Sequence, residues 1–384
     1  MKYVKVKDLG QIVTGNTPPT SDMSNYGNYM PFIKATDIIL GSRYTYVTEQ
    51  GYSEKSYKKY KANIVPKGST CIVTIGSIGK KMTQAHTDLF VNQAINAILP
   101  YKQYDKDYIY YATKYAVLPQ LKIYDSGTTS GRENISKSSF SNIRLYVEED
   151  FSTQQKIASI LSAYDCLFEN NTRRIRLLEQ MAENLYKEWF VRFRFPEHEK
   201  VEMVNGLPKG WKVEKIKECV KRLPFGRTYK AKELSQDGEV IVIDQSTSDF
   251  LGFHNNTPDH HATFNSPIIL FGDHSCKFCL MTRNFSLGEN IIPFISKDTK
   301  QIDNYYLYFA THKLIVTEEY KRHWGRLSSM KILIPTIDIQ QKFNKLIIKN
   351  EKMKKLLFIQ NQLLTRQRDL LLPRLMSGKL EVKS

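Results

Sequence analysis

Two long stretches of the chain place apolar residues at alternating intervals of three and four, the spacing of a helix that buries one face. Residues 154–193 contain neither Gly nor Pro, and Asn171 interrupts their apolar face. Residues 338–372 repeat the pattern between Pro335 and Pro373. Each helix would be roughly 50–60 Å long at 1.5 Å per residue. Because the two have equal length and matched apolar seams, we expect a coiled coil whose register Asn171 fixes.

The apolar face of both helices is the predicted surface for helix packing and partner docking. Its residues are Ile157, Leu161, Tyr164, Phe168, Leu178, Leu185 and Trp189 in the first helix, and Phe343, Leu346, Met353, Leu357, Leu364 and Leu371 in the second. The alternative is that each helix is buried within its own domain. The length of the helices favours mutual pairing, since they exceed what an ordinary domain of this size contains.

Short apolar runs bounded by Gly, Pro and Asn precede each long helix and are typical of strands. The first set lies at residues 30–33, 70–75 and 90–98, followed by a helix-like segment at 107–121. The second set lies at residues 239–243, 268–271, 290–295 and 331–334. Each set predicts a small mixed α/β or α+β domain.

Three sequence matches in the same order indicate that the chain contains two copies of one structural unit. The alternation of residues 3–13 returns at 211–220, the Tyr-rich segment 107–114 returns at 304–312, and Gln154-Gln-Lys returns at Gln340-Gln-Lys. The period is far longer than that of a solenoid repeat. We therefore divide the chain into a mixed domain (1–150), a long helix (151–196), a charged linker (197–210), a second mixed domain (211–336) and a distal helix with its tail (337–384).

The charge balance points to the kind of partner. The 384 residues include 56 Lys and Arg against 39 Asp and Glu, a formal net charge of +17. Such an excess favours a polyanion, above all nucleic acid. With 41% hydrophobic residues, disorder over the whole length is excluded. No apolar run suits a membrane span or signal peptide, and five scattered cysteines fit a reducing compartment, so we expect a cytoplasmic protein.

Signals for chemistry are weak, and no catalytic residue is predicted. The chain has no Gly-x-Gly-x-x-Gly, and the Gly-Lys turn at residues 76–81 lacks the spacing of a phosphate-binding loop. Cys276 and Cys279 form a single Cys-x-x-Cys with three histidines nearby, but the first copy has no such pair. Zinc needs four ligands, so we expect reduced cysteines beside a strand and no metal.

Signals for binding are stronger, because basic residues recur in turns beside aromatic or polar ones. Lys and Arg neutralise phosphates, and Arg and Asn can also read base edges. The candidates are Lys34, Arg43, Lys80, Lys81, Arg132, Asn134 and Lys137 in the first copy, and Arg227, Lys230, Lys277, Arg283, Arg322, Trp324 and Arg326 in the second. Two of the stretches, 126–135 and 322–327, precede the final strand of each copy and are predicted to face DNA.

Five segments carry a resemblance to a known family. They are Gly10-Gln-Ile-Val-Thr-Gly-Asn-Thr-Pro18, the segment Pro31-Phe-Ile-Lys-Ala-Thr-Asp-Ile38, and the segments 155–165, 178–190 and 371–380. Over essentially its whole length the chain resembles the specificity subunit of a Type I restriction-modification enzyme. The second mixed domain departs most, since Arg227-Thr-Tyr stands where a Thr-Gly-x-Thr-Pro opening would follow Val220.

The resemblance implies a division of labour. Two target recognition domains would each read one half of an asymmetric, bipartite DNA site, held apart by two antiparallel helices related by an internal pseudo-two-fold repeat. The helices would dock two methyltransferase subunits, which use S-adenosylmethionine to methylate adenine at N6. Two restriction subunits would use ATP and Mg²⁺ to cleave DNA. No cofactor would be bound by this chain.

Two other functions are compatible with parts of the pattern. A self-contained nuclease or methyltransferase with cryptic motifs would cut or methylate DNA when purified alone. An architectural coiled-coil adaptor would bind all duplexes equally and lose binding at moderate salt.

Overall fold

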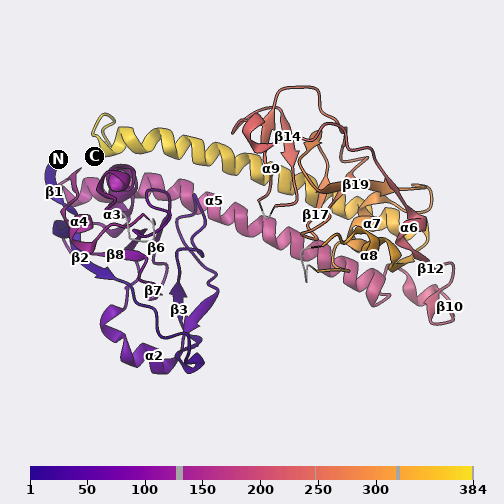
Figure 1. Cartoon of the computed structure of the whole chain (residues 1–384), viewed down its shortest axis with the longest axis horizontal. Helices are drawn as coiled ribbons and strands as arrows, with labels where there is room; N and C mark the ends of the chain where they lie inside the picture. Colours follow the sequence, from indigo (N-terminus) through magenta and orange to yellow (C-terminus); the bar gives the residue numbers. More distant parts are fainter. Residues whose placement is uncertain (127–132, 247, 317–320, 383–384) are drawn as a thin grey trace. The chain divides into compact units, whose positions relative to one another are not determined.

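The computed structural model describes residues 1–126, 133–246, 248–316 and 321–382. The chain forms two compact units (Figure 1). Unit 1 comprises Met1–Arg173 together with Phe358–Ser384, and unit 2 comprises Arg174–Leu357. Each unit therefore contains a part of both long helices, α5 (Phe151–Tyr186) and α9 (Ile337–Met376). Within the described residues, no helix is long and apolar enough to cross a membrane.

The described residues of unit 1 form three small sheets. They are the pair β1 (Lys2–Lys5) and β9 (Arg144–Val147); the order β2 (Gly10–Thr14), β8 (Ile95–Pro100), β5 (Thr70–Val73) and β6 (Met82–Gln84); and the order β4 (Gln50–Tyr52), β3 (Tyr26–Ile33) and β7 (Phe90–Val91). The four-stranded sheet is antiparallel throughout, whereas β3 and β7 are parallel. Its short helices are α1 (Val6–Leu9), α2 (Glu54–Lys59), α3 (Lys106–Ala112) and α4 (Lys137–Asn142).

Unit 2 repeats this topology strand for strand. Its sheets are β12 (Lys212–Lys215) with β20 (Lys331–Ile334); β13 (Val220–Arg222), β19 (Ile291–Ser296), β16 (Ile268–Gly272) and β17 (Phe278–Met281); and β15 (Gly252–His254), β14 (Val240–Ile243) and β18 (Phe285–Leu287). Here too β14 and β18 are parallel. Its short helices are α6 (Ile216–Cys219), α7 (Asn304–Thr311) and α8 (Trp324–Ser329), and the hairpin β10 (Met203–Val204) and β11 (Leu207–Pro208) precedes β12. The predicted duplication and mixed fold class are confirmed.

The repeated glutamine has the same structural role in both units. The Gln154 side chain accepts a hydrogen bond from the Asp105 amide at 2.8 Å and donates to the Glu148 carbonyl at 2.8 Å. The Gln340 side chain accepts from the Asp303 amide at 2.9 Å and donates to the Pro335 carbonyl at 2.8 Å. Asp105 and Asp303 are the N-caps of α3 and α7, and both glutamines are fully buried. Each long helix is thereby joined to the short helix of its own copy.

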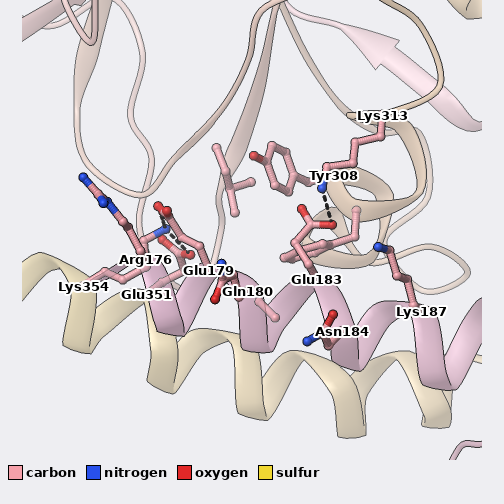
Figure 2. A pocket seen from close by; sticks show the side chains of 13 residues that line it. Arg176, Glu179, Gln180, Glu183, Asn184, Lys187, Tyr308, Lys313, Glu351 and Lys354 are labelled. Carbon is pink, nitrogen blue, oxygen red and sulfur yellow. Dashed lines mark hydrogen bonds and ion pairs between the residues drawn. The ribbon is translucent and has the colours of Figure 1, made fainter. Parts of the chain in front are cut away.

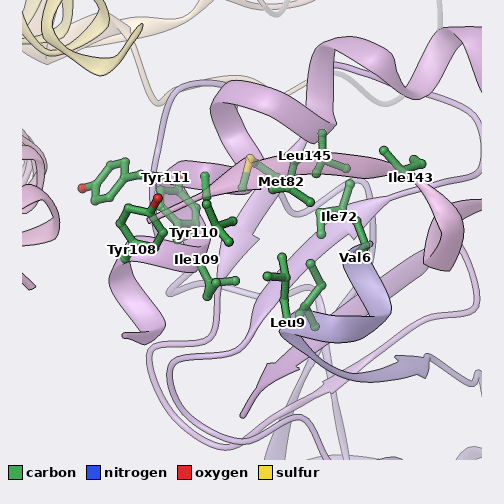
Figure 3. Close-up of a cluster of buried hydrophobic side chains, with 14 of the residues drawn as sticks. Val6, Leu9, Ile72, Met82, Tyr108, Ile109, Tyr110, Tyr111, Ile143 and Leu145 are labelled. Atoms are coloured by element: carbon green, nitrogen blue, oxygen red, sulfur yellow. The ribbon is translucent and has the colours of Figure 1, made fainter. Parts of the chain in front are cut away.

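The core of unit 1 lies between the four-stranded sheet, α3 and the two long helices (Figure 3). Ile72 and Met82 of the sheet pack with Tyr108 of α3, and α5 adds Leu161. The last turns of α9 add Leu372, Leu375 and Met376. The core of unit 2 is built in the same way, with Phe343 and Ile347 from the start of α9 and Ala182 from the end of α5. Trp189 and Phe190 come from the π-helical turn Lys187–Val191 that continues α5.

Polar residues fill several positions in the seam between α5 and α9. In unit 1, Asn171 donates to the Asn361 side chain at 3.0 Å, and Asn361 donates to the Thr172 hydroxyl at 3.2 Å. In unit 2, Lys354 lies 3.1 Å from Glu179. Residue numbers fall along α9 as they rise along α5, so the helices are antiparallel in both units.

The predicted seam of α9 is corrected at two positions. Leu346 and Met353 are each 41% exposed, whereas their neighbours Ile347 and Lys354 face inwards. The register follows from the buried polar contacts of Lys354 and Asn361, which apolar spacing alone does not reveal. Of the other predicted packing residues, Ile157, Leu161, Trp189, Phe343, Leu357 and Leu364 are buried, and Tyr164, Phe168, Leu178, Leu185 and Leu371 are half-buried. Pro373 does not end α9, which continues to Met376.

The most deeply buried ion pair of the described residues joins α5 to α9 in unit 1. Arg368 donates to Asp165 at 2.5 Å, both side chains are 3% exposed, and the Tyr111 hydroxyl donates to the second Asp165 oxygen at 2.5 Å. Burial alone would lower the pKa of Arg368, but Asp165 raises it above its ordinary value. The guanidinium therefore stays charged.

Replacing Arg368 by Met should strongly destabilise unit 1, because the Asp165 carboxylate would remain buried without its cation. Removal of one partner from a buried pair costs about 3–5 kcal/mol. Urea unfolding of Arg368→Met and of the parent chain measures this loss. Lys209→Met is the matched control, since Lys209 and its partner Glu202 are 69% and 65% exposed, and it should leave the unfolding midpoint unchanged. Equal midpoints for all three proteins would contradict the assigned role of Arg368.

Candidate nucleic-acid interface

Backbone hydrogen bonds bring three loops of unit 1 together beyond the end of β5. The Gly76 amide donates to the Glu133 carbonyl at 2.9 Å, and the Ile135 amide donates to the Thr74 carbonyl at 2.9 Å. The Lys81 ammonium donates to the Ala35 carbonyl at 3.0 Å. The loop after β3, the β5–β6 turn and the segment before α4 therefore form one cluster, which contains the candidates Lys34, Lys80, Lys81, Asn134 and Lys137. Arg132 lies outside the described residues.

Hydrogen bonds also hold the corresponding loops of unit 2 together. The His323 amide donates to the Asp273 carbonyl at 2.8 Å, and the Trp324 amide donates to the Asp273 carboxylate at 2.8 Å. The Lys277 ammonium donates to the Asp244 carbonyl at 3.2 Å and also to the Ser248 carbonyl. Lys277, Arg322, Trp324 and Arg326 are thereby collected around the β16–β17 turn.

Lys81 and Lys277 occupy equivalent positions in the two copies. The Val73 amide donates to the Lys81 carbonyl and the Gly272 amide donates to the Lys277 carbonyl, each just beyond a pair of antiparallel strands. Each lysine then reaches back to a carbonyl in the loop after the equivalent strand, β3 or β14. Their ammonium groups hold a loop in place and have less freedom to contact phosphates than exposed lysines have.

Arg43 does not lie in the loop cluster, contrary to the expectation that it faces DNA. Its side chain is 2% exposed and lies 2.6 Å from Asp107. It also donates to Gln84 at 2.7 Å and to the Ser162 hydroxyl of α5 at 2.9 Å. Although burial would lower the pKa of Arg43, Tyr111 and Asp107 raise it above its ordinary value. Its acceptors come from distant parts of the chain, so Arg43 is a buried cation that holds these parts of the fold together.

The remaining candidates differ in how exposed they are. Lys80, Lys137, Lys230, Arg227, Arg322 and Arg326 are exposed. Lys34 pairs with Glu49 at 2.5 Å, and Arg227 lies over the Tyr229 ring at 4.8 Å. Burial lowers the pKa of Arg283, which donates to the Glu239 carbonyl at 3.3 Å. Trp324 is half-buried, and its ring lies 5.3 Å from that of Phe294.

The residues that tie the loops together were missed in the sequence. Asp273 follows β16, and its carboxylate accepts from the first residue of α8. Glu133 has a similar role in unit 1, since its carboxylate accepts from the Ile78 amide at 3.2 Å. Neither residue carries a signal in the sequence, because an acidic residue in a loop looks the same whether or not it accepts a hydrogen bond from the amide of another loop.

The described residues contain no group of three or more His, Cys, Asp or Glu side chains close enough to hold a metal ion. Cys276 and Cys279 are free thiols; Cys276 precedes β17 and Cys279 lies within it, where burial raises the pKa of its thiol.

Comparisons with known proteins agree with this architecture. Residues 1–180 match the family model of the Type I restriction modification DNA specificity domain. The Type I restriction enzyme MjaIX specificity subunit of Methanocaldococcus jannaschii is 27% identical, over 99% of this chain and 93% of that protein. The HindI specificity subunit of Haemophilus influenzae is 30% identical over 45% of this chain and 38% of that protein.

A solved structure shows the same fold. It is the S subunit of a Type-I restriction-modification system from M. genitalium, with a TM-score of 0.59, 16% identity, and coverage of 98% of this chain and 96% of that chain. The chain belongs to the specificity subunits of Type I restriction-modification systems. It is the DNA specificity component of such a system, and not a catalytic one.

Replacing Lys81 by Ala should loosen the loop after β3, because the Ala35 carbonyl loses a charged donor. A hydrogen bond to a charged group contributes about 1.5–3 kcal/mol, so amide exchange at Asp37 should accelerate by about tenfold or more. Hydrogen exchange measured by mass spectrometry or NMR tests this. The neighbouring Lys80→Ala is the control, since its exposed side chain holds no loop. Equal exchange rates in both variants would show that Lys81 does not hold the loop.

Proposed function

We propose that the chain reads a bipartite, asymmetric DNA site, with residues 1–150 and 211–336 as two target recognition domains that each read one half. The observation that carries this proposal is the repeated topology with different loop side chains at equivalent places. At one pair of equivalent positions, for example, Thr74 accepts from its neighbouring loop through its backbone carbonyl alone. Asp273 accepts through its carbonyl and also through its side-chain carboxylate. Two similar scaffolds with different loops suit two different half-sites.

The contacts to DNA are proposed first for the loop clusters, through Lys80, Lys137 and the half-buried Asn134 in unit 1, and through Arg322 and Arg326 in unit 2. Lys34, Arg227, Lys230 and Arg283 are proposed as further contacts, and so is Arg132, which lies outside the described residues. Lysines there would neutralise phosphates, while arginines and Asn134 have the donors and acceptors that read base edges. Lys81, Lys277 and Trp324 would position these loops, and Arg43 is not included.

The long helices are proposed to act as the spacer and as the docking surface of partner subunits. The relatives of this chain are named as specificity subunits of Type I restriction enzymes, which supports a complex with partner subunits. We infer that these partners are two methyltransferase and two restriction subunits. In this proposal S-adenosylmethionine, ATP and Mg²⁺ bind to those partners. The chain would direct adenine-N6 methylation, or ATP-dependent cleavage, to the sites that it recognises.

Alanine substitution of Lys137 or Arg227 should weaken DNA binding and reduce its dependence on salt. Each phosphate contact that is lost lowers the slope of log affinity against log salt concentration by about 1. Fluorescence anisotropy of the assembled complex on its cognate duplex, at several salt concentrations, gives both quantities. Lys345→Ala removes an exposed lysine from α9 and is the matched control. Unchanged affinity and slope in both loop variants would argue against this interface.

The spacer role is tested by inserting one heptad into both α5 and α9 at facing positions. Seven residues add ~10 Å of helix, roughly three base pairs. Mapping of methylated adenines in cells should then show the same half-sites with a gap about three base pairs longer. A heptad inserted into α9 alone is the control and should abolish methylation, because it breaks the pairing of the helices. A doubly lengthened variant that methylates the original spacing would overturn the proposal.

A further inference from the structure

The pocket of unit 2 between α5, α7 and α9 has a volume of about 760 Å³, but basic and acidic side chains line it together (Figure 2). Several of them pair with one another, as Lys354 does with Glu179 and Glu351 at 3.1 Å. Such mixed charge does not define a ligand. The loop that follows β13 is different, because it exposes one arginine, Arg227, on two buried aromatic rings.

Arg227 lies at the outer end of a stack of three side chains. Its guanidinium carbon lies 4.8 Å from the centre of the Tyr229 ring. That ring is nearly parallel to the His254 ring, with 4.3 Å between the ring centres and 7° between the planes. Both rings are buried, whereas the Arg227 side chain is 57% exposed. The two rings therefore form a buried platform beneath an exposed guanidinium.

Polar contacts fix both ends of this stack. The Asn256 amide donates to Nδ1 of His254 at 3.1 Å, and burial lowers the pKa of His254, so its imidazole is uncharged at neutral pH. At the other end, Nη2 of Arg227 donates to the Glu233 carboxylate at 3.3 Å. Arg227 has no other hydrogen-bond partner among the described residues. Its remaining donors are thus held in a fixed direction and are available to a ligand, which lowers the entropy cost of binding.

Unit 1 has a different arrangement at the equivalent place. The amides of Asn16 and Tyr229 donate at 3.0 Å to the carbonyls of the last residues of β7 and β18, so these two residues correspond. Gly15 alone separates β2 from Asn16, whereas residues 223–228 separate β13 from Tyr229. The segment that carries Arg227 is therefore an insertion that the second copy has and the first lacks.

The ring beneath this segment also differs between the copies. Tyr52 and His254 are the last residues of the equivalent strands β4 and β15. The Tyr52 hydroxyl donates to the Asn16 carbonyl at 2.6 Å, so in unit 1 this ring holds a loop backbone. In unit 2 the His254 ring instead supports a second ring that carries an arginine. Recognition of two different half-sites requires such a difference between two similar scaffolds.

The insertion begins beside the loop cluster of unit 2. Strands β13 and β16 both run antiparallel to β19, so the loops that follow them leave the sheet at the same edge. The loop after β16 is the turn that holds Asp273 and Lys277. Arg222, the last residue of β13, lies over the Trp324 ring at 5.6 Å. The loop of Arg227 therefore starts next to residues of the proposed DNA interface.

We propose that Arg227 reads a guanine in the half-site that unit 2 recognises, and that Tyr229 and His254 orient it. A guanidinium can donate two parallel hydrogen bonds to O6 and N7 of guanine in the major groove. Phosphates require only positive charge, which exposed lysines supply, whereas a stacked planar fork suits the edge of a base. The inference deepens the proposed function and rests on it.

The first test maps methylated adenines in cells that carry Arg227→Lys. The variant keeps the charge but loses the planar fork, so one G·C pair in one half of the motif should become dispensable while the other half stays unchanged. Arg144→Lys is the matched control and should leave the motif unchanged, since Arg144 is an exposed arginine of β9 that also lies over a tyrosine ring, that of Tyr3, at 5.7 Å.

The outcomes separate this inference from the proposed function. A motif that depends on the gene, but keeps every G·C requirement in Arg227→Lys, would overturn the role of Arg227 alone. A map of methylated adenines that does not depend on the gene would instead contradict the proposed function.

Binding of the assembled complex to modified duplexes locates the contact. Each guanine of the motif is replaced in turn by 7-deazaguanine, which keeps Watson–Crick pairing but lacks the N7 acceptor. The parent complex should lose at least about fivefold in affinity at one guanine, and Arg227→Lys should lose much less there. Because the charge is kept, the salt dependence of Arg227→Lys should equal that of the parent. Equal losses for both complexes at every guanine would reject guanine as the target.

Variants of Tyr229 test the platform. Tyr229→Leu keeps Arg227 but removes the ring beneath it, and should reproduce the 7-deazaguanine result of Arg227→Lys. Tyr229→Phe keeps the ring and should behave like the parent, since the Tyr229 hydroxyl has no hydrogen bond among the described residues. A Tyr229→Leu complex with the full loss of the parent would reject the orienting role. Arg227→Lys leaves both buried rings intact, so the assignment of guanine stays testable if Tyr229→Leu fails to fold.

Discussion

The structure depends on one constraint: neither mixed domain completes its core without the far end of the long helix from the other copy. The last turns of α9 bury Leu375 and Met376 in unit 1, and the π-helical turn that continues α5 buries Trp189 and Phe190 in unit 2. Burying a large apolar side chain contributes about 1.5–3 kcal/mol, so each domain owes a substantial part of its stability to the opposite helix. The two helices are therefore structural members of both cores as well as connections between them.

The seam between the helices adds specificity to this constraint. Leu357, Leu364 and Leu371 recur every seven residues, and a slip of one heptad would bring leucines opposite the same kind of surface. The polar residues Lys354, Asn361 and Arg368 differ from one another, and each has its own partner on α5. A slip would leave these groups buried without partners, at a cost that apolar contacts could not offset. The ionic and amide contacts thus define the register of α5 against α9.

Much of this fold could be predicted from the sequence, because it is carried by local periodicity and repetition. The long helices follow from apolar spacing, and the duplication follows from repeated words such as Gln154-Gln-Lys. What that glutamine does could not be predicted, since its partner Asp105 lies far along the chain. The two α9 errors have the same origin: Leu346 and Met353 fit the apolar spacing, but pairing with α5 decides which face of α9 is buried.

The candidate site was harder to predict, because an arginine in a loop looks the same whether it is exposed or buried. Arg43 and Arg227 both stand near a tyrosine in a loop, yet Arg43 is 2% exposed and Arg227 is 57% exposed. Only the acceptors around Arg43, which come from α3, α5 and β6, distinguish them. Lys81 and Lys277 likewise look like phosphate contacts in sequence, but their carbonyl partners make them part of the scaffold.

The central claim is that this chain alone determines which DNA sequence its complex modifies. The most direct measurement is a genome-wide map of methylated adenines in cells with the gene, without it, and with the gene restored. The account predicts that one two-part motif with a fixed gap loses its methylation on deletion and regains it on restoration. A map that stays unchanged on deletion, although the chain co-purifies with an active methyltransferase subunit, would contradict the account.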